Sequence, residues 1–130
     1  MAPPPARRPS VAWALLALDG RINREVFWLG NIFCAALAIA VARTELLIVV
    51  SPETGAVSTV NPLALGVFAV LVWTEVALVV KRLHDRGLTG WIALFLPIPV
   101  LSIIGFIVVG LMPGQRGGNP YAPGPNQRGR

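Results

Sequence analysis

Three long uncharged stretches divide the chain. They cover residues 26–42, 54–74 and 87–115 and contain 17, 21 and 29 residues, respectively. About 20 apolar helical residues cross the hydrocarbon core of a bilayer, so each stretch approaches or exceeds the length of a membrane span. The pattern therefore predicts an all-α integral membrane protein with three transmembrane helices.

The three predicted spans cover approximately residues 25–50, 62–82 and 91–112. The third span is not uniform, because Pro97 and Pro99 remove backbone N–H donors and are expected to break it into a short first part and a longer second part. We expect three full crossings. The alternative is that the break produces a re-entrant hairpin, which would keep the C-terminus on the same side as the N-terminus.

The remaining segments are polar or short. Residues 1–10 contain four prolines and two arginines, a composition that predicts a disordered tail. A short apolar segment, Val11 to Leu18, is expected to lie at the bilayer surface. Residues 11–112 then form a single membrane domain, and residues 113–130 form a polar C-terminal tail with turns.

The composition and the charge distribution support a membrane location. The chain is 55% hydrophobic and 13% charged, against roughly 25% charged in an ordinary soluble domain. Four of the eleven Lys and Arg residues precede the first span, one lies between the first two spans, three lie in residues 81–90, and three lie in the tail. The positive-inside rule places the N-terminus and residues 81–90 in the cytoplasm and residues 51–61 on the opposite side. We expect no nucleic-acid partner.

Charged residues are expected to gather at the cytoplasmic rim of the membrane. Arg21 and Arg24 are three residues apart and share one side of a helix. Together with Arg82 they can cradle phosphate or carboxylate oxygens, and anionic lipid is the simplest ligand. The favoured interpretation is that these residues are topology anchors that bond carbonyls and lipid headgroups in general. The candidate anion- or headgroup-binding residues are Arg21, Arg24, Lys81, Arg82, His84, Asp85 and Arg86.

The neighbouring His84 and Asp85 do not predict an active site. Adjacent residues do not face each other on a helix, and one histidine with Cys34 cannot make a structural zinc site. We expect no catalytic residue, metal or cofactor. Instead, Asp85 is expected to accept hydrogen bonds from Arg21 or Arg24, and His84 to contact backbone or headgroups. A membrane-embedded hydrolase or transferase using His84 and Asp85 is the least favoured alternative.

Glu75 is an acid inside the second predicted span. A carboxylate at membrane depth is costly and points to a partner or a water-filled path. We expect an ion pair with Arg82, seven residues later on the same face, or with Arg21 or Arg24. The alternative is a proton or cation relay, which requires a homo-oligomer because three thin helices cannot enclose a pore.

Three polar blocks resemble a known family. They are Leu18-Asp-Gly-Arg-Ile-Asn-Arg-Glu-Val-Phe-Trp28, Lys81-Arg-Leu-His-Asp-Arg-Gly-Leu-Thr-Gly-Trp91, and Pro113-Gly with Gly118-Asn-Pro-Tyr121. They resemble the YhaH-type family of small bacterial inner-membrane proteins, a domain of unknown function (number 805), over residues of about 18–121. The family's recurring residues fall on Gly20, Arg21, Arg24, Phe27, Trp28, Arg82, His84, Asp85, Gly87, Gly90, Trp91, Pro97, Asn119 and Tyr121.

The resemblance implies a multi-pass protein of the bacterial cytoplasmic membrane with no assigned activity and no catalytic residue to inherit. Together with the charge pattern, it predicts a non-enzymatic protein. We expect an accessory or assembly subunit of a larger membrane complex, or a protein that binds anionic lipid. A homo-oligomeric small transporter or channel that uses Glu75 is the alternative.

Overall fold

The fold is mostly helical, with one small β-hairpin. The computed structural model describes residues 9–43, 48–50, 53–55, 57–60, 62–95 and 99–129. In chain order the elements are α1 (Val11–Leu16), α2 (Arg24–Arg43), β1 (Ile48–Val50), β2 (Val57–Val60), α3 (Pro62–Asp85), the 3-10 helix η1 (Gly90–Phe95) and α4 (Pro99–Leu111).

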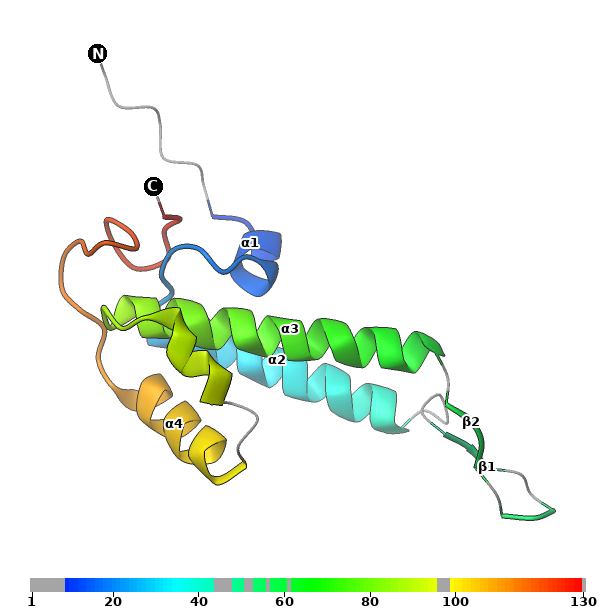
Figure 1. The fold of residues 1–130 in the computed structure, drawn as a ribbon. Coiled ribbons are helices and arrows are strands. Elements are labelled where there is room, and N and C mark those ends of the chain that lie inside the picture. Colours follow the sequence, from blue (N-terminus) through cyan, green and yellow to red (C-terminus); the bar gives the residue numbers. More distant parts are fainter. Residues whose placement is uncertain are drawn as a thin grey trace.

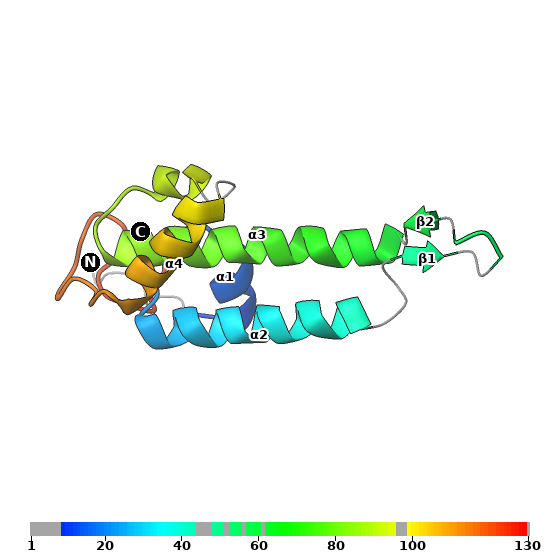
Figure 2. The same cartoon turned by 90° about the horizontal axis from the view of Figure 1, so that it is seen from below.

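The two longest helices, α2 and α3, lie side by side and run in opposite directions (Figures 1 and 2). The Asn23 side-chain oxygen caps the start of α2 by accepting a hydrogen bond from the Val26 backbone N–H at 2.9 Å. Helix α3 begins at Pro62, a residue suited to the first helical position, and is followed by Gly87 with a φ of +73°. A Cβ atom at Gly30 would lie 2.9 Å from Leu78, so this glycine allows the two helices to approach closely.

Both α2 and α3 are long and apolar enough to cross a membrane. Only 17% of the most apolar window of α2 and 39% of that of α3 is buried inside the protein. Large apolar side chains such as Ile32 and Val72 are therefore exposed. An apolar surface of this extent is rare in a protein surrounded by water, and lipid or a partner would cover it.

The third predicted span is divided between η1 and α4. Helix α4 has 13 residues and is about 20 Å long at 1.5 Å per residue, shorter than the roughly 30 Å hydrocarbon core. Its last turn lies near the start of α2, because the Trp28 indole donates to the Gly110 carbonyl at 3.3 Å. The described part of the chain thus contains two helices of spanning length rather than three. Helix α4 begins at Pro99, and Pro97 lies outside the described residues.

The segment between α2 and α3 corrects two predictions. The first span does not continue as a helix to residue 50, because α2 ends at Arg43 and Ile48–Val50 pairs antiparallel with Val57–Val60. The fold is therefore not purely α-helical. Ile and Val favour extended backbone, and Gly55, with a φ of +66°, lies in the turn between the strands. The hairpin projects beyond the ends of α2 and α3 (Figure 2).

The opposite end of the α2–α3 pair, where α2 begins and α3 ends, is called the rim below. Helix α1 packs against α3 between the rim and the middle of that helix, because the Trp73 indole donates to the Leu16 carbonyl at 2.8 Å. The Ser10 hydroxyl caps α1 by accepting from the Trp13 N–H at 3.2 Å. Residues 1–8 of the predicted N-terminal tail lie outside the described residues. Residues 114–129, predicted as a polar tail, fold back across the rim (Figure 1). We call residues 114–129 the strap.

The buried core lies near the rim rather than along the helices. Its members include Ile22, Phe27, Leu78, Leu83 and Ala93, contributed by α2, α3, η1 and the segment before α2. Phe27, Trp28 and Phe106 form an aromatic cluster that joins α2 to α4. This packing fixes the framework on which the polar side chains of the rim are held.

Candidate functional site: a buried charge cluster at the rim

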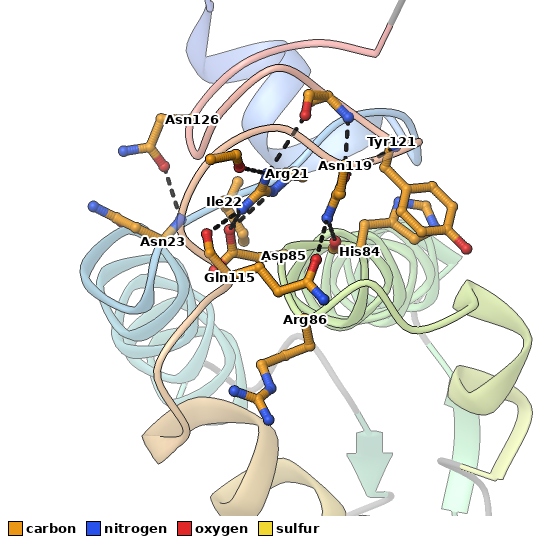
Figure 3. Close-up of polar contacts among 12 residues, drawn as sticks. Arg21, Ile22, Asn23, His84, Asp85, Arg86, Gln115, Asn119, Tyr121 and Asn126 are labelled. Atoms are coloured by element: carbon orange, nitrogen blue, oxygen red, sulfur yellow. Dashed lines mark hydrogen bonds and ion pairs between the residues drawn. The ribbon is translucent and has the colours of Figure 1, made fainter.

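Asp85 is the centre of a buried cluster with Arg21 and Arg82. One carboxylate oxygen accepts from the Arg21 Nε and Nη2 atoms at 3.1 and 3.0 Å, and the other accepts from Arg82 Nη1. The three side chains are at most 3% exposed. The predicted hydrogen bond from Arg21 to Asp85 is therefore confirmed (Figure 3). Arg24, the other predicted donor, does not bind Asp85.

The strap completes the coordination of Arg21. The guanidinium donates to the backbone carbonyls of Gly117, Gln115 and Ala122 at 2.7, 2.8 and 3.4 Å. The Arg21 backbone N–H also donates to the Gln127 carbonyl at 3.0 Å. Arg21 was predicted to face headgroup oxygens, and here protein oxygens occupy those positions.

Arg82 ties three further segments to the cluster. Its guanidinium donates to the carbonyls of Ile22 and Val109 at 3.5 and 3.1 Å, and to that of Met112. Two guanidinium groups share one carboxylate, so the cluster holds one excess positive charge. The backbone carbonyls offset this charge, because buried cations need acceptors for each of their donors.

Lys81 points to a different place, the end of α1. Its ammonium group donates to the carbonyls of Trp13, Ala14 and Ala17 at 2.8, 2.5 and 2.6 Å and lies 5.2 Å from the centre of the Trp13 ring. The last carbonyls of a helix lack partners within the helix and carry its negative dipole. Lys81 therefore caps α1 and fixes it against α3, and it does not join the predicted anion cradle.

His84 packs against the strap. Its ring stacks on Tyr121 with a centroid distance of 3.9 Å and an angle of 5°. Its Nδ1 atom lies 3.2 Å from the Gly20 carbonyl, and its own carbonyl accepts from the Asn119 amide at 2.7 Å. The predicted contact of His84 with backbone is confirmed. Among the described residues, no three His, Cys, Asp or Glu side chains form a group that could hold a metal ion.

Arg24 and Arg86 are the more open members of the predicted set. Arg24 is exposed and lines an open pocket of about 310 Å³ together with Asn23, Gln115 and the buried Arg82 and Asp85. The half-buried Arg86 extends away from the cluster towards α4 and donates to the Pro113 carbonyl (Figure 3). All seven predicted residues thus lie at the rim, but only Arg24 presents its charge mainly to the outside.

The predicted ion pair of Glu75 is not formed. Arg21 and Arg82 both bind Asp85 instead. Glu75 is half-buried within α3, and its side chain has no hydrogen bond or ion pair to any residue that the structure describes. The reason is geometric: Asp85 lies about one helical turn beyond Arg82 and within reach of Arg21, whereas Glu75 lies two turns back along α3.

A family model covers almost all of this framework. The model described as "Protein of unknown function (DUF805)" matches residues 15–123, from the end of α1 into the strap. The chain belongs to the DUF805 family. This finding confirms the resemblance drawn from the three polar blocks. Neither the curated proteins nor the solved structures contain a match to the chain.

Within this DUF805 chain, sequence reasoning missed the role of the strap. Gly114 shows why a glycine stands there, since a Cβ atom would lie 1.9 Å from an Asp85 oxygen. One signal in the sequence could have indicated this role, because Asn119 and Tyr121 are among the recurring residues of the family pattern. Asn119 holds the carbonyl of His84 and Tyr121 covers its ring, so both residues belong to the rim rather than to a free tail.

Proposed function

We propose that the protein is a non-enzymatic integral membrane protein of the bacterial cytoplasmic membrane. It acts as an accessory or assembly subunit that packs beside a larger membrane protein. The observation that carries this proposal is an inverted distribution of residues. Four charged groups of the rim are turned inward and bound by the protein itself, namely Arg21, Lys81, Arg82 and Asp85, while many large apolar side chains of the helices are turned outward.

The inward charges argue against catalysis. A general acid or base needs a free position within hydrogen-bond reach of a substrate. Both oxygens of Asp85 are occupied by arginines, and one face of the His84 ring is covered by Tyr121. The arrangement is suited to holding segments together rather than to moving protons.

The outward apolar faces argue for partners within the bilayer. Leu29, Ile32 and Phe33 are exposed on α2, and Ile103 and Ile104 are exposed on α4. No water is available at membrane depth, so lipid chains or the apolar side of another protein would cover these faces. A chain of this size offers more outward than inward helical surface, as suits a subunit that completes its packing against another protein.

We place the protein in the membrane with α2 and α3 as the crossing helices and with η1 and α4 as a re-entrant hairpin. Support comes from the position of the last turn of α4, where the Val109 carbonyl accepts from Arg82 at the rim. The rim then lies on the cytoplasmic side because it carries most of the arginines that flank the helices. Both termini are cytoplasmic in this arrangement, and the β-hairpin lies on the opposite side.

Native purification tests the accessory role. The full-length protein carries a C-terminal affinity tag and is extracted in a mild detergent, and the composition of the purified particle is measured by native mass spectrometry. We expect a larger membrane protein in fixed stoichiometry. An unrelated two-span protein with the same tag is the control. A particle that contains this chain alone would contradict the proposal.

A second candidate function, proton or cation transport by a homo-oligomer, is favoured by Glu75. A carboxylate without a partner in an apolar helix marks an ion path in many membrane proteins. The test compares Glu75→Gln with the wild type in flux measurements on proteoliposomes, with the exposed Glu53→Gln as the matched control. The transport hypothesis expects flux that Glu75→Gln abolishes and Glu53→Gln leaves intact. Equal flux in all three proteins would contradict it.

A further inference from the structure

The strap occupies the positions that an anion would take on Arg21. Three carbonyl oxygens, from Gln115, Gly117 and Ala122, surround the guanidinium on the side away from Asp85. A guanidinium binds phosphate oxygens through the same fork of N–H donors. Phosphate oxygens bear more charge than carbonyl oxygens and bind guanidinium groups more strongly. The carbonyls of the strap are therefore replaceable ligands of this arginine.

The strap is held mainly by hydrogen bonds and little by apolar packing. It contains five glycines and three prolines, and among its residues only Ala122 is buried. Segments with few buried apolar contacts open locally at a small cost in free energy. The strap is thus the part of the rim that separates most easily from the helices.

Open space lies beneath and within the strap. The pocket of about 310 Å³ is lined by Gln115 and Pro125 of the strap and by Arg24 and Asp85 of the helices. A second pocket of about 360 Å³ is lined by Gly118, Asn119, Pro120, Ala122 and Pro123. A phosphate group is small compared with either volume. An anion can therefore approach the edge of the strap before the strap has moved away.

Arg24 stands where such an anion would arrive. It is exposed, lines the first pocket and forms no ion pair with any residue that the structure describes. The cluster behind it already holds one excess positive charge, because Arg21 and Arg82 share the single carboxylate of Asp85. The exposed Glu25 also lines this pocket and offsets the charge of Arg24, so the net positive charge beside the pocket is the one that Arg21, Arg82 and Asp85 leave in the cluster.

We propose that the strap is a displaceable cover over an anion site formed by Arg21 and Arg24. The ligand is a phosphate-bearing anion, supplied by an anionic lipid headgroup on the rim side of the membrane. Binding replaces the three strap carbonyls on Arg21 by phosphate oxygens and releases residues 114–129 from the rim. This inference rests on the membrane placement proposed above and not on the accessory partner.

Hydrogen–deuterium exchange on the unmodified full-length protein tests the proposal. The protein is reconstituted in nanodiscs of phosphatidylcholine alone or of phosphatidylcholine mixed with phosphatidylglycerol. The informative amides belong to Arg21, Asn23 and Gln115, which donate to Gln127, Asn126 and Asp85, respectively, and hold the strap in place. We expect their exchange to accelerate in the anionic nanodiscs by roughly fivefold for each arginine that the headgroup engages.

Matched variants and a soluble anion separate the possible causes. Arg24→Gln is expected to reduce the acceleration by roughly fivefold, whereas Arg43→Gln, at the far end of α2, leaves it unchanged. Inorganic phosphate is added to phosphatidylcholine nanodiscs against sodium chloride of equal ionic strength. Acceleration by phosphate alone supports the same anion site with a soluble source.

Two results would overturn the inference. One is unchanged or slower exchange of these amides with both phosphatidylglycerol and phosphate. The other is an equal response in wild type and Arg24→Gln. Failure of the protein to insert into nanodiscs at all would contradict the membrane placement itself. Absence of a larger partner in native purification bears on the accessory role and leaves the anion site unaffected.

Discussion

The rim differs from the long apolar parts of α2 and α3, called the shafts below, in which side chains are buried and which are exposed. At the rim, Arg21, Lys81, Arg82 and Asp85 are almost completely buried, and every one of them is bound to protein oxygens or nitrogens. Along the shafts, residues such as Ile32 are 63% exposed. Polar groups that leave water must find partners within the protein, whereas apolar groups in lipid need none. Ionised side chains of the rim are therefore buried because the protein itself supplies their partners, whereas the apolar side chains of the shafts remain exposed.

The largest effect is expected at the carboxylate that holds the rim together. Asp85→Asn keeps the shape of the side chain but leaves two buried guanidinium groups without a counter-charge. Breaking a buried ion pair in this way costs about 3–5 kcal/mol. Chemical unfolding in detergent micelles measures the loss in free energy of unfolding.

Glu53→Gln is the control for Asp85→Asn, because Glu53 is an exposed acid in the turn of the β-hairpin. It is expected to change the free energy of unfolding by less than about 0.5 kcal/mol. Equal stability of Asp85→Asn and Glu53→Gln would show that the charge cluster does not stabilise the rim.

A smaller effect is expected where a single cation caps a short helix. Lys81→Met keeps the apolar stem of the side chain but removes the donor to three carbonyls of the α1 end. Lost hydrogen bonds to a charged group cost about 1.5–3 kcal/mol. We expect α1 to detach from α3 while α2 and α3 stay paired, and faster proteolytic cleavage near α1 measures this release.

Arg43→Met is the matched control for Lys81→Met, since Arg43 is an exposed basic residue at the far end of α2. Its cleavage rate near α1 should equal that of the wild type. A Lys81→Met protein that resists protease as well as the wild type does would mean that the packing of Trp13 and the hydrogen bond from Trp73 to the Leu16 carbonyl hold α1 without Lys81.

The smallest effect is expected on the outward face of a shaft. Ile32→Ala removes apolar atoms on the exposed face of α2, so we expect a loss below about 0.5 kcal/mol in free energy of unfolding. Leu78→Ala, at a fully buried position, should cost about 2–5 kcal/mol. Both variants are measured by the same unfolding titration in micelles. A large loss for Ile32→Ala in the isolated protein would place Ile32 in a contact between copies of the chain.

The main parts of the fold that the sequence predicts correctly are those governed by local pattern. The start of α2 near Glu25 and the start of α3 at Pro62 follow from the charge boundaries and from proline chemistry. The bond from Arg21 to Asp85 was predicted because both residues had to lie at one end of the helices. The hairpin was missed because an apolar run of Ile and Val is compatible with either a helix or a strand, and pairing between Ile48–Val50 and Val57–Val60 decides the matter.

The partner of Glu75 was predicted wrongly for a related reason. Spacing along α3 places Glu75 and Arg82 on one face, but spacing cannot show that Asp85 competes for the same arginine from a closer position. The contacts of the strap were even less predictable from the sequence than the partner of Glu75. Its glycines, prolines and asparagines carry no periodicity, so nothing local indicates that its carbonyls would return to Arg21, 94 to 101 residues earlier in the chain.

The sequence by itself determined that this chain has long helices of membrane length and that most of its ionised groups, Glu75 excepted, lie at or beyond their ends, because these properties depend on residues close together along the chain. Only the tertiary structure decided that Asp85 serves two arginines, that Glu75 has no counter-charge among the described residues, and that the strap fills the outer side of Arg21. In each case, groups that are distant in the sequence compete for the same hydrogen-bond donors. The group that lies nearest to the donor in the folded protein forms the bond, and the sequence alone does not show which group that is.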